Sequence, residues 1–262
     1  MTKRTPQARP AVDLNVDAGE SFGAYAVGAD DAIVPLVTSV NVACGLHGGD
    51  PLVMRRTVRL AASHGAAVGA HPGYPDLQGF GRRAMAIPPE ELVQILLYQI
   101  GALAAIAGAE TVTLQHVKPH GALYTAAVAD AAVAEAVIEA VGSVALPLVA
   151  LSGSRWAERA RQAGLRVAEE AFIDRGYRPD GTLVPRGRPG ALITDPEQAA
   201  ERAVRLVVEG TVQAVSGEVL PVRADTLCLH SDTPNVAAIA RAVRAALTAA
   251  GVRIAPLNDW LL

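Results

Sequence analysis

The segment from Asp13 to Glu20 carries three acidic residues and one asparagine among apolar neighbours. As a β-strand it would place Asp13, Asn15 and Asp17 on one face, because successive side chains point to opposite sides. A carboxylate buried without a partner is strongly destabilising, so these groups need mutual hydrogen bonds, a ligand or water. The alternative is an edge strand whose polar face lies in solvent. Gly19 marks the expected end of the strand and leaves Glu20 on the following loop.

Five further polar motifs follow apolar segments along the chain. They are Asn41–Asp50 with His47, His71–Asp76, His116–Gly121 with Lys118 and His120, Glu170–Arg175 with Asp174, and His230–Asp232. Imidazole and carboxyl groups can transfer protons, and Lys or Arg can offset negative charge that develops in a reaction. Each motif lies at the carboxyl end of an expected strand, where parallel barrels and open sheets assemble their active sites. Of the six histidines, His64 alone is expected only to end a helix.

Asp50 and Cys44 each have two interpretations. Asp50 precedes Pro51 and is expected either to cap a helix or to contact a substrate. Cys44 lies close to His47, but a nucleophilic cysteine needs a lowered pKa and an adjacent base, so packing is the favoured interpretation. Cys228 is distant in sequence, and two such cysteines predict neither a disulfide framework nor a zinc knuckle.

The basic residues near these motifs are ambiguous as well. Lys118, held extended by Pro119, is expected either to neutralise the acidic strand or to clamp a substrate. Arg82 and Arg83 follow the segment Gly79–Gly81 and form either a solvated pair or a contact with substrate or phosphate.

Apolar β-type segments alternate with longer stretches of helical period, which predicts βα units around a parallel sheet. The expected strands are Ala11–Val16, Ser39–Ala43, Ala66–Ala70, Val112–Val117, Pro147–Leu151, Val167–Phe172 and Thr226–Leu229. The expected helices are Leu52–Ser63, Pro89–Ala107, Ala126–Val141, Arg155–Ala163, Glu197–Val208 and Asn235–Ala250. A long loop or small hairpin is expected over Asp174–Thr194. No linker divides the chain, so we predict one domain over residues 11–262 after a flexible tail at residues 1–10.

The composition excludes several classes of partner. Of the 262 residues, 51% are hydrophobic, which is enough for one large core. A net charge of −3 without a Lys/Arg run predicts neither nucleic-acid binding nor attraction to an anionic membrane. The segment Met1–Pro10 lacks the apolar core of a secretory signal, and no apolar run reaches the length of a membrane span. We therefore expect a cytoplasmic protein.

Together the motifs resemble the LamB/YcsF family. The resemblance spans Asp13–Glu20, Asn41–Pro51, Ala70–Arg83, His116–Tyr124, Phe172–Tyr177 and His230–Pro234, and so covers nearly the whole chain after the tail. It implies a TIM-like (β/α) barrel of about seven parallel strands, similar to the glycoside hydrolase/deacetylase barrels. It also implies the activity of the A subunit of a bacterial ATP-dependent 5-oxoprolinase, which acts with B and C subunits. That complex converts 5-oxo-L-proline, ATP and water into L-glutamate, ADP and phosphate.

The site residues that the resemblance implies form two groups. Those expected to be catalytic are Asp13, Asp17, Glu20, His47, His71, Lys118 and His120, and those expected to bind substrate are Asn15, Asn41, Asp50, Arg82, Arg83, Glu170, Asp174, Arg175, His230 and Asp232. Thr125 stands where the family commonly has Asn and is assigned no ligand contact. ATP, as its Mg²⁺ complex, is expected in this chain, in a partner subunit or between them, because no G-x-x-x-x-G-K-[ST] loop is present. No tightly bound metal is predicted.

The expected chemistry starts from the stability of a lactam, whose carbonyl resists attack by water until its oxygen is phosphorylated. Asp17 or Asp13 is expected to act as general base, with a pKa raised by burial and by neighbouring acids. Lys118 is expected to offset charge on the oxygen, together with His71 or His120. A binding subunit without activity of its own is one alternative. Another is a metal-dependent hydrolase with His47, His71, His116, His120 and Asp17 as candidate ligands.

Overall fold

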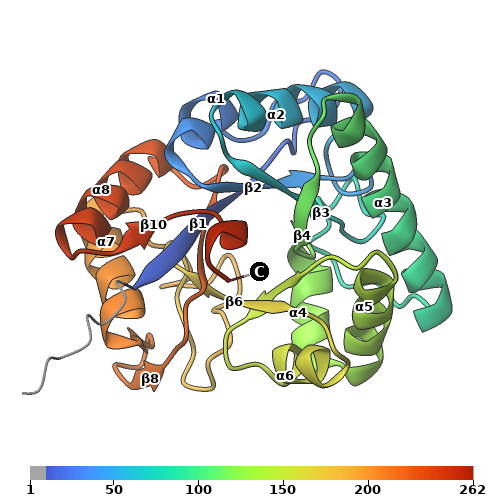
Figure 1. Cartoon of the computed structure of the whole chain (residues 1–262). Helices are drawn as coiled ribbons and strands as arrows, with labels where there is room; N and C mark the ends of the chain where they lie inside the picture. Colours follow the sequence, from blue (N-terminus) through green and yellow to red (C-terminus); the bar gives the residue numbers. More distant parts are fainter. Residues whose placement is uncertain (1–9, 262) are drawn as a thin grey trace, which may run out of the picture.

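The computed structural model describes residues 10–261 (Figure 1). The tail expected at residues 1–10 lies outside the described residues except for Pro10, and so does the last residue of the expected domain.

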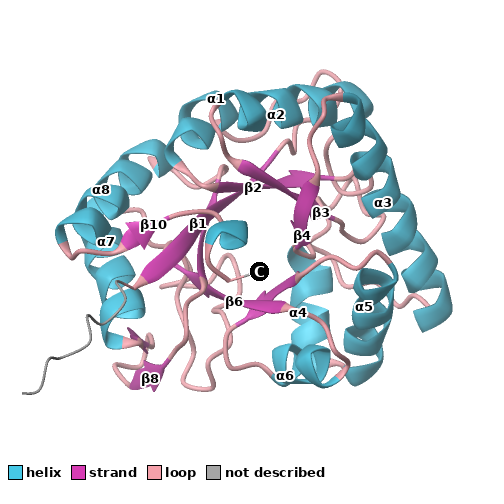
Figure 2. Cartoon of the chain, in the orientation of Figure 1, coloured by secondary structure: helices cyan, strands magenta, loops and turns pink. Residues whose placement is uncertain are grey.

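Seven parallel strands form a closed barrel. They are β1 (Ala11–Ala18), β2 (Ser39–Ala43), β3 (Ala67–His71), β4 (Leu114–Val117), β5 (Leu148–Leu151), β6 (Val167–Phe172) and β9 (Thr226–His230). Each strand pairs in parallel with the next, and β1 closes the ring by pairing with β9. Figure 2 shows the strands around the centre and the helices outside them. The expected TIM-like barrel is confirmed, and its parallel strands bring all their carboxyl ends to one mouth.

Helices cover the outside of this barrel. They are α1 (Asp30–Ile33), α2 (Pro51–Ser63), α3 (Pro89–Ala109), α4 (Gly121–Ala129), α5 (Ala131–Ser143), α6 (Arg155–Gln162), α7 (Pro196–Val204) and α8 (Val236–Ala249). A 3₁₀ turn η1 (Val34–Leu36) follows α1, and a π-helical turn η2 (Arg205–Glu209) follows α7. A short hairpin of β7 (Thr211–Gln213) and β8 (Val219–Pro221) comes after η2. Side-chain oxygens of Asp50, Asp130, Ser154 and Asp195 cap four of the helices at the N-terminus, as these residue types favour.

The prediction of a single helix over Ala126–Val141 is wrong. The chain forms α4 and α5 instead, which meet at Asp130 with a bend of 116°. Asp130 is extended, with φ −118° and ψ 123°, and its side chain accepts a hydrogen bond from the backbone N–H of Ala132. The break is hard to see in an alanine-rich sequence, because a single Asp is its only local signal.

Helix α3 is long and apolar enough, by length and composition, to cross a membrane, and so is the bent pair of α4 and α5 if both formed one span. The expectation that no apolar run has this length is therefore wrong. In the structure the apolar face of α3 is buried through Leu96, Ile100 and Leu103, and Gln99 bonds to the backbone of Gly73. Packing on the barrel accounts for the composition of this helix.

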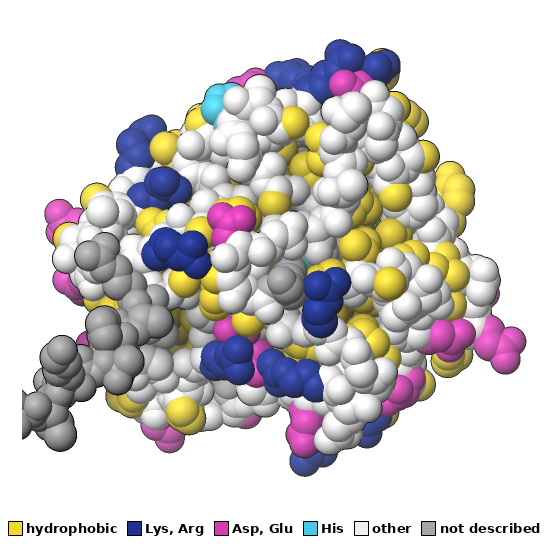
Figure 3. Space-filling view, viewed as in Figure 1, with side chains coloured by type: hydrophobic (Ala, Val, Ile, Leu, Met, Phe, Trp, Pro, Cys, Tyr) yellow, Lys and Arg dark blue, Asp and Glu magenta, His cyan; other side chains and the backbone are white. Residues whose placement is uncertain are grey.

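The C-terminal segment fills the amino-terminal end of the barrel. The short strand β10 (Arg253–Ile254) pairs with the start of β1, and the turn η3 (Leu257–Asp259) follows it. Leu257 packs against Val149 and Ala168, at the starts of β5 and β6. Figure 1 shows η3 over the centre of the barrel, and Figure 3 shows basic side chains spread among acidic and apolar ones on this face. The polar motifs lie at the opposite end.

Candidate active site

The polar face of β1 points into the barrel and is buried. Asp13, Asn15 and Asp17 are each at most 4% exposed. Nδ2 of Asn15 donates to Oγ1 of Thr226 at 2.6 Å, and Nδ2 of Asn41 donates to Oδ1 of both Asn15 and Asp17. The alternative of a solvent-facing edge strand is wrong, because β1 pairs with β2 on one side and β9 on the other.

Asp13 lies at the amino-terminal end of this polar face. Its carboxylate accepts hydrogen bonds from the hydroxyl groups of Thr38, Ser39 and Thr226, at the starts of β2 and β9. Burial raises the pKa of Asp13 to about 6, although the hydroxyl donors oppose this effect. Asp13 lines neither of the two cavities at the other end, and its hydrogen bonds favour a structural role over a catalytic one.

Asp13 should make the protein less stable as pH rises. Its folded pKa of about 6 exceeds the usual value of 3.8, so the folded state binds a proton more tightly than the unfolded state. Stability should therefore fall between about pH 4 and pH 6, by on the order of 3 kcal/mol from this group. Urea unfolding of the wild type and of Asp13→Asn at pH 4 and pH 7 measures the effect. An equal pH dependence in both proteins would contradict it.

Lys118 balances the charge at the level of Asp17. Its Nζ lies 2.8 Å from Oδ1 of Asp17, 2.8 Å from Oε1 of Glu170 and 2.9 Å from Sγ of Cys228. Burial would lower the pKa of Lys118, but the Asp17 carboxylate, with Cys228 and Glu170, raises it well above the usual value. These contacts support the counter-ion interpretation of Lys118, which also lines the inner cavity.

Asp17 does not have the raised pKa that we expected. Burial would raise it, but nearby His71 and Lys118 hold the pKa of Asp17 well below its ordinary value. Its Oδ2 lies 3.3 Å from Nε2 of His71 and 3.7 Å from Nε2 of His230. Asp17 is therefore an ionised, weakly basic carboxylate that anchors the basic groups around it.

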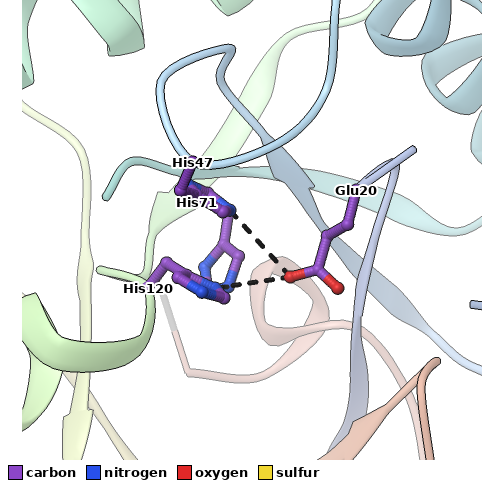
Figure 4. Close-up of side chains that lie close together, drawn as sticks. All are labelled: Glu20, His47, His71 and His120. Atoms are coloured by element: carbon purple, nitrogen blue, oxygen red, sulfur yellow. Dashed lines mark hydrogen bonds and ion pairs between the residues drawn. The ribbon is translucent and has the colours of Figure 1, made fainter. Parts of the chain in front are cut away.

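Glu20 and three histidines meet beside Asp17, at or after the carboxyl ends of the strands β1 to β4 (Figure 4). Oε1 of Glu20 lies 3.3 Å from Nδ1 of His120 and 3.9 Å from Nε2 of His47, and Nδ1 of His120 lies 3.0 Å from Nε2 of His71. All four side chains are buried. Burial, with Asp17 and Asp232, raises the pKa of Glu20, and burial next to the other rings lowers the pKa of both His47 and His120. The imidazoles of His47 and His120 are therefore neutral.

The loop around Phe80 covers this cluster. The Phe80 ring packs edge-on against His47 and His120, and its carbonyl oxygen lies 2.8 Å from Nε2 of His120. A Cβ at Gly81 would approach to 2.8 Å of both His47 and His120. The Gly79–Gly81 segment thus packs on the imidazoles, and Gly81 is explained by this close approach.

His230 and Asp174 form a second pair at the mouth. Nδ1 of His230 lies 2.9 Å from Oδ2 of the buried Asp174, which also accepts a hydrogen bond from Oγ1 of Thr233. Burial would raise the pKa of Asp174, but His230 and Thr233 lower it. The pair is rigid, and the His230 side chain borders the inner cavity.

Two adjoining cavities open at this mouth. The inner one, of about 50 Å³, is lined by Asp17, His71, Lys118, His120, His230 and Arg175, among others. The outer one, of about 590 Å³, has the size of a small-molecule site. Four arginines line the outer cavity: Arg82, Arg175, Arg178 and Arg186. Asp232 pairs with Arg82 at 2.7 Å and lies 3.7 Å from Arg186. The mouth is therefore suited to an anionic ligand.

Two of the expected substrate-binding residues, Asp50 and Arg83, are engaged in contacts of the loops around the mouth. Oδ1 of Asp50 caps α2 by accepting from the backbone N–H groups of Leu52 and Val53, and its Oδ2 accepts from Gly23. Arg83 forms an ion pair with Asp76, and neither Asp50 nor Arg83 lines either of the two cavities. The polar atoms of both side chains are engaged in these contacts, which favours structural roles for Asp50 and Arg83.

Loss of the Asp50 cap should affect stability rather than activity. Asp50→Ala is expected to lower the free energy of unfolding by about 1 kcal/mol, whereas Asp50→Asn keeps a capping oxygen and loses less. Urea unfolding measures this difference. A fall in turnover of the folded Asp50→Asn protein would instead show that Asp50 contributes to the active site.

The remaining titratable candidates are also structural. Nε2 of His116 lies 2.6 Å from Oδ1 of Asn41, and burial lowers the pKa of His116 to about 3. His116 is thus separate from the other proposed metal ligands. Burial raises the pKa of Cys44 to about 12, and its thiol donates to the carbonyl of Val42. This favours the packing interpretation of Cys44 over the nucleophile.

Several cavity residues were not predicted from the sequence. Tyr124 lies one turn after His120 on α4, and Arg186 comes from the long loop after β6. Thr125, which was assigned no ligand contact, lines both cavities. All three residues follow the carboxyl end of a strand, which was the available signal. Only the tertiary structure shows which of the residues after a strand turn toward the cavity.

Comparisons with known proteins agree with this fold. The sequence model of the LamB/YcsF family matches residues 12–261. A Pyrococcus abyssi (strain GE5 / Orsay) protein, named as the A subunit of 5-oxoprolinase, is 55% identical over 252 residues, covering 95% of this chain and 99% of that protein. A Thermus thermophilus protein of the same name is 58% identical over 245 residues, covering 93% of this chain and 98% of that protein. The crystal structure of the lactam utilization protein from Thermus thermophilus has a TM-score of 0.88 and 57% identity, covering 94% of this chain and 99% of that one. The chain therefore belongs to the LamB/YcsF family.

Proposed function

We propose that this chain is the A subunit of an ATP-dependent 5-oxoprolinase and contains the site where the lactam ring opens. Its relatives are named as the A subunit of 5-oxoprolinase, which places them in a complex of several subunits. The observation that carries the proposal is the Asp174–His230 pair, which faces the cavity that Asp17 and Lys118 line. This arrangement supplies a proton acceptor next to fixed charges.

His230 is the best-placed general base. Because the Asp174 carboxylate accepts the hydrogen bond, Nδ1 of His230 carries the proton and Nε2 keeps its lone pair. His230 takes a proton from water as the water attacks the carbonyl carbon, and Asp174 stabilises the imidazolium that forms. Asp17, 3.7 Å from the same Nε2, adds to this stabilisation. This assignment replaces the expected role of Asp17 or Asp13 as base.

ATP coupling fits the chemistry of the ring. Transfer of the γ-phosphoryl group to the lactam oxygen makes the carbon electrophilic, one water adds to it, and the C–N bond breaks as the nitrogen takes a proton. A second water then releases phosphate from the acyl phosphate, which leaves L-glutamate. The four arginines of the outer cavity suit the carboxylate and phosphoryl groups of such an intermediate. We propose that the B and C subunits contribute to the site of Mg²⁺–ATP.

Reconstitution tests the proposal. The chain is assembled with its B and C subunits, and L-glutamate formation from 5-oxoproline is measured with each component omitted in turn. Glutamate should form only with this chain, both partners and ATP present. Normal turnover without this chain would overturn the catalytic assignment. If this chain then still binds 5-oxoproline, although turnover does not require it, the chain is a binding subunit.

A metal-dependent hydrolase of another amide is the second candidate. It is favoured by the grouping of Glu20 with His47, His71 and His120. This function requires hydrolysis by the chain alone, without ATP or partner subunits, so the same reconstitution separates the two.

A further inference from the structure

The backbone fixes the orientation of two histidine rings in the Glu20 cluster. Nδ1 of His71 lies 2.6 Å from the carbonyl oxygen of Lys118, and Nε2 of His120 lies 2.8 Å from that of Phe80. A carbonyl oxygen can only accept a hydrogen bond, so these two nitrogens carry the ring protons. The other two nitrogens, Nε2 of His71 and Nδ1 of His120, remain for contacts within the cluster.

These two nitrogens face each other at 3.0 Å, and Nε2 of His71 also lies 3.3 Å from Oδ2 of Asp17. Oε1 of Glu20 lies 3.3 Å from Nδ1 of His120 and accepts no hydrogen bond, and neither ring nitrogen of the buried His47 has a partner among the described residues. Buried polar atoms are rarely left without partners, so the unpartnered atoms of Glu20 and His47 indicate a ligand bound at the centre of the cluster.

A single added proton does not satisfy the cluster. A proton on Nε2 of His71 would serve His71 and His120, but it would leave Glu20 and His47 without partners. A metal ion serves all four at once. The four ligand atoms lie within 4.8 Å of one another, and ligand atoms around a tetrahedral zinc ion lie about 3.4 Å apart.

We infer that Glu20, His47, His71 and His120 bind one divalent transition-metal ion through three imidazole nitrogens and one carboxylate oxygen. Imidazole with carboxylate favours zinc or a neighbouring first-row ion over magnesium or calcium. The carbonyl groups of Lys118 and Phe80 act as the outer hydrogen-bond partners that orient metal-binding histidines. His71 and His120 also line the inner cavity, so the ion would lie beside the proposed lactam site.

A second group of possible ligands does not compete. Asp17, Cys228 and His230 also bring ligand atoms within 4.8 Å of one another. The ammonium group of Lys118, however, lies 2.8 Å from Asp17 and 2.9 Å from Cys228, and so already supplies a cation there. The Glu20 cluster has no such basic side chain in contact among the residues that the structure describes.

Metal binding is measured on the full chain without lactam, ATP or partner subunits. Purified protein is stripped with a chelator, dialysed, and titrated with Zn²⁺ by calorimetry, and the bound metal is counted by mass spectrometry. We expect one Zn²⁺ per chain. His120→Ala and Glu20→Gln should each weaken the affinity by more than about 100-fold. His64→Ala, which removes an exposed histidine from the end of α2, should leave the affinity unchanged.

Cobalt gives an independent measurement on the wild type, which is decisive even if a variant fails to fold. Co²⁺ in the stripped protein should show the intense visible absorption of a four-coordinate site, and one equivalent of Zn²⁺ should remove it. A folded wild type that binds no stoichiometric metal, or an equal loss of affinity in His64→Ala and His120→Ala, would overturn the inference. Glutamate formation is assayed separately from metal binding. Failure to bind metal would therefore leave the proposed function standing, and failure to form glutamate would leave the metal site standing.

Discussion

Replacement of Lys118 by methionine is expected to lower the free energy of unfolding by about 3–5 kcal/mol and the rate of 5-oxoproline turnover by about 10²–10³. The Lys118 ammonium is the cation between the carboxylates of Asp17 and Glu170, each 2.8 Å away. Methionine has a similar length but no charge, so both acids would remain buried without their counter-ion. Urea unfolding and glutamate formation by the reconstituted complex measure the two effects.

A second substitution separates charge from packing in this prediction. Glu170→Gln in the Lys118→Met background removes one of the two orphaned charges and should restore part of the lost stability, because the penalty comes from the uncompensated carboxylates. Turnover should stay low in the double variant, since the cation in the cavity is still missing. If the double variant is as unstable as Lys118→Met alone, the charge-balance account of Lys118 is incorrect.

His230→Gln is expected to reduce the rate of ring opening in the complex by about 10²–10⁴, the usual contribution of a general base. The glutamine side chain can still bond to Asp174, but it cannot accept a proton from water. Asp174→Asn should cause a related loss, because the amide no longer stabilises the imidazolium and favours the wrong tautomer. The measurement is the rate of glutamate formation at saturating ATP, followed as a function of pH.

The pH profile distinguishes a catalytic from a structural role for His230. The wild-type rate should depend on pH through the group that takes the proton from water, whereas the residual rate of His230→Gln should lack that limb of the profile. Unfolding midpoints of the two proteins serve as the control for stability. A pH limb that persists unchanged in His230→Gln would assign the proton transfer to another group.

Much of the barrel could be predicted from the sequence. Ser39–Ala43 and Val167–Phe172 have the expected bounds, and the other barrel strands differ from expectation by one or two residues at an end. Buried parallel strands give short apolar runs between helical periods, and this signal is local. The break at Asp130 was missed because a single capping residue marks it. The segment near Leu257, which fills one end of the barrel, was missed because it depends on contacts with distant strands.

The candidate site was predicted less completely than the fold. Asp17, His71, Lys118, His120 and His230 do converge on one cavity, as their positions after parallel strands indicated. Asp13 and Asp50 do not join them, although they lie in the same motifs. Alternation along a strand shows which face a residue occupies but not which end of the barrel it reaches.

The order of residues is enough to predict the βα units of a parallel sheet and the edge at which the polar motifs gather, because these follow from apolar periodicity and from polar residues at strand ends. The motifs also indicated the family, and the closed barrel was implied by that resemblance. Protonation states and hydrogen-bond partners arise only in the folded chain. Folding lowers the pKa of Asp17 through His71 and Lys118, holds His230 on Asp174, and brings Nε2 of His71 to 3.0 Å from Nδ1 of His120. These properties depend on distances of about 3 Å between residues far apart in the chain, which no local pattern encodes.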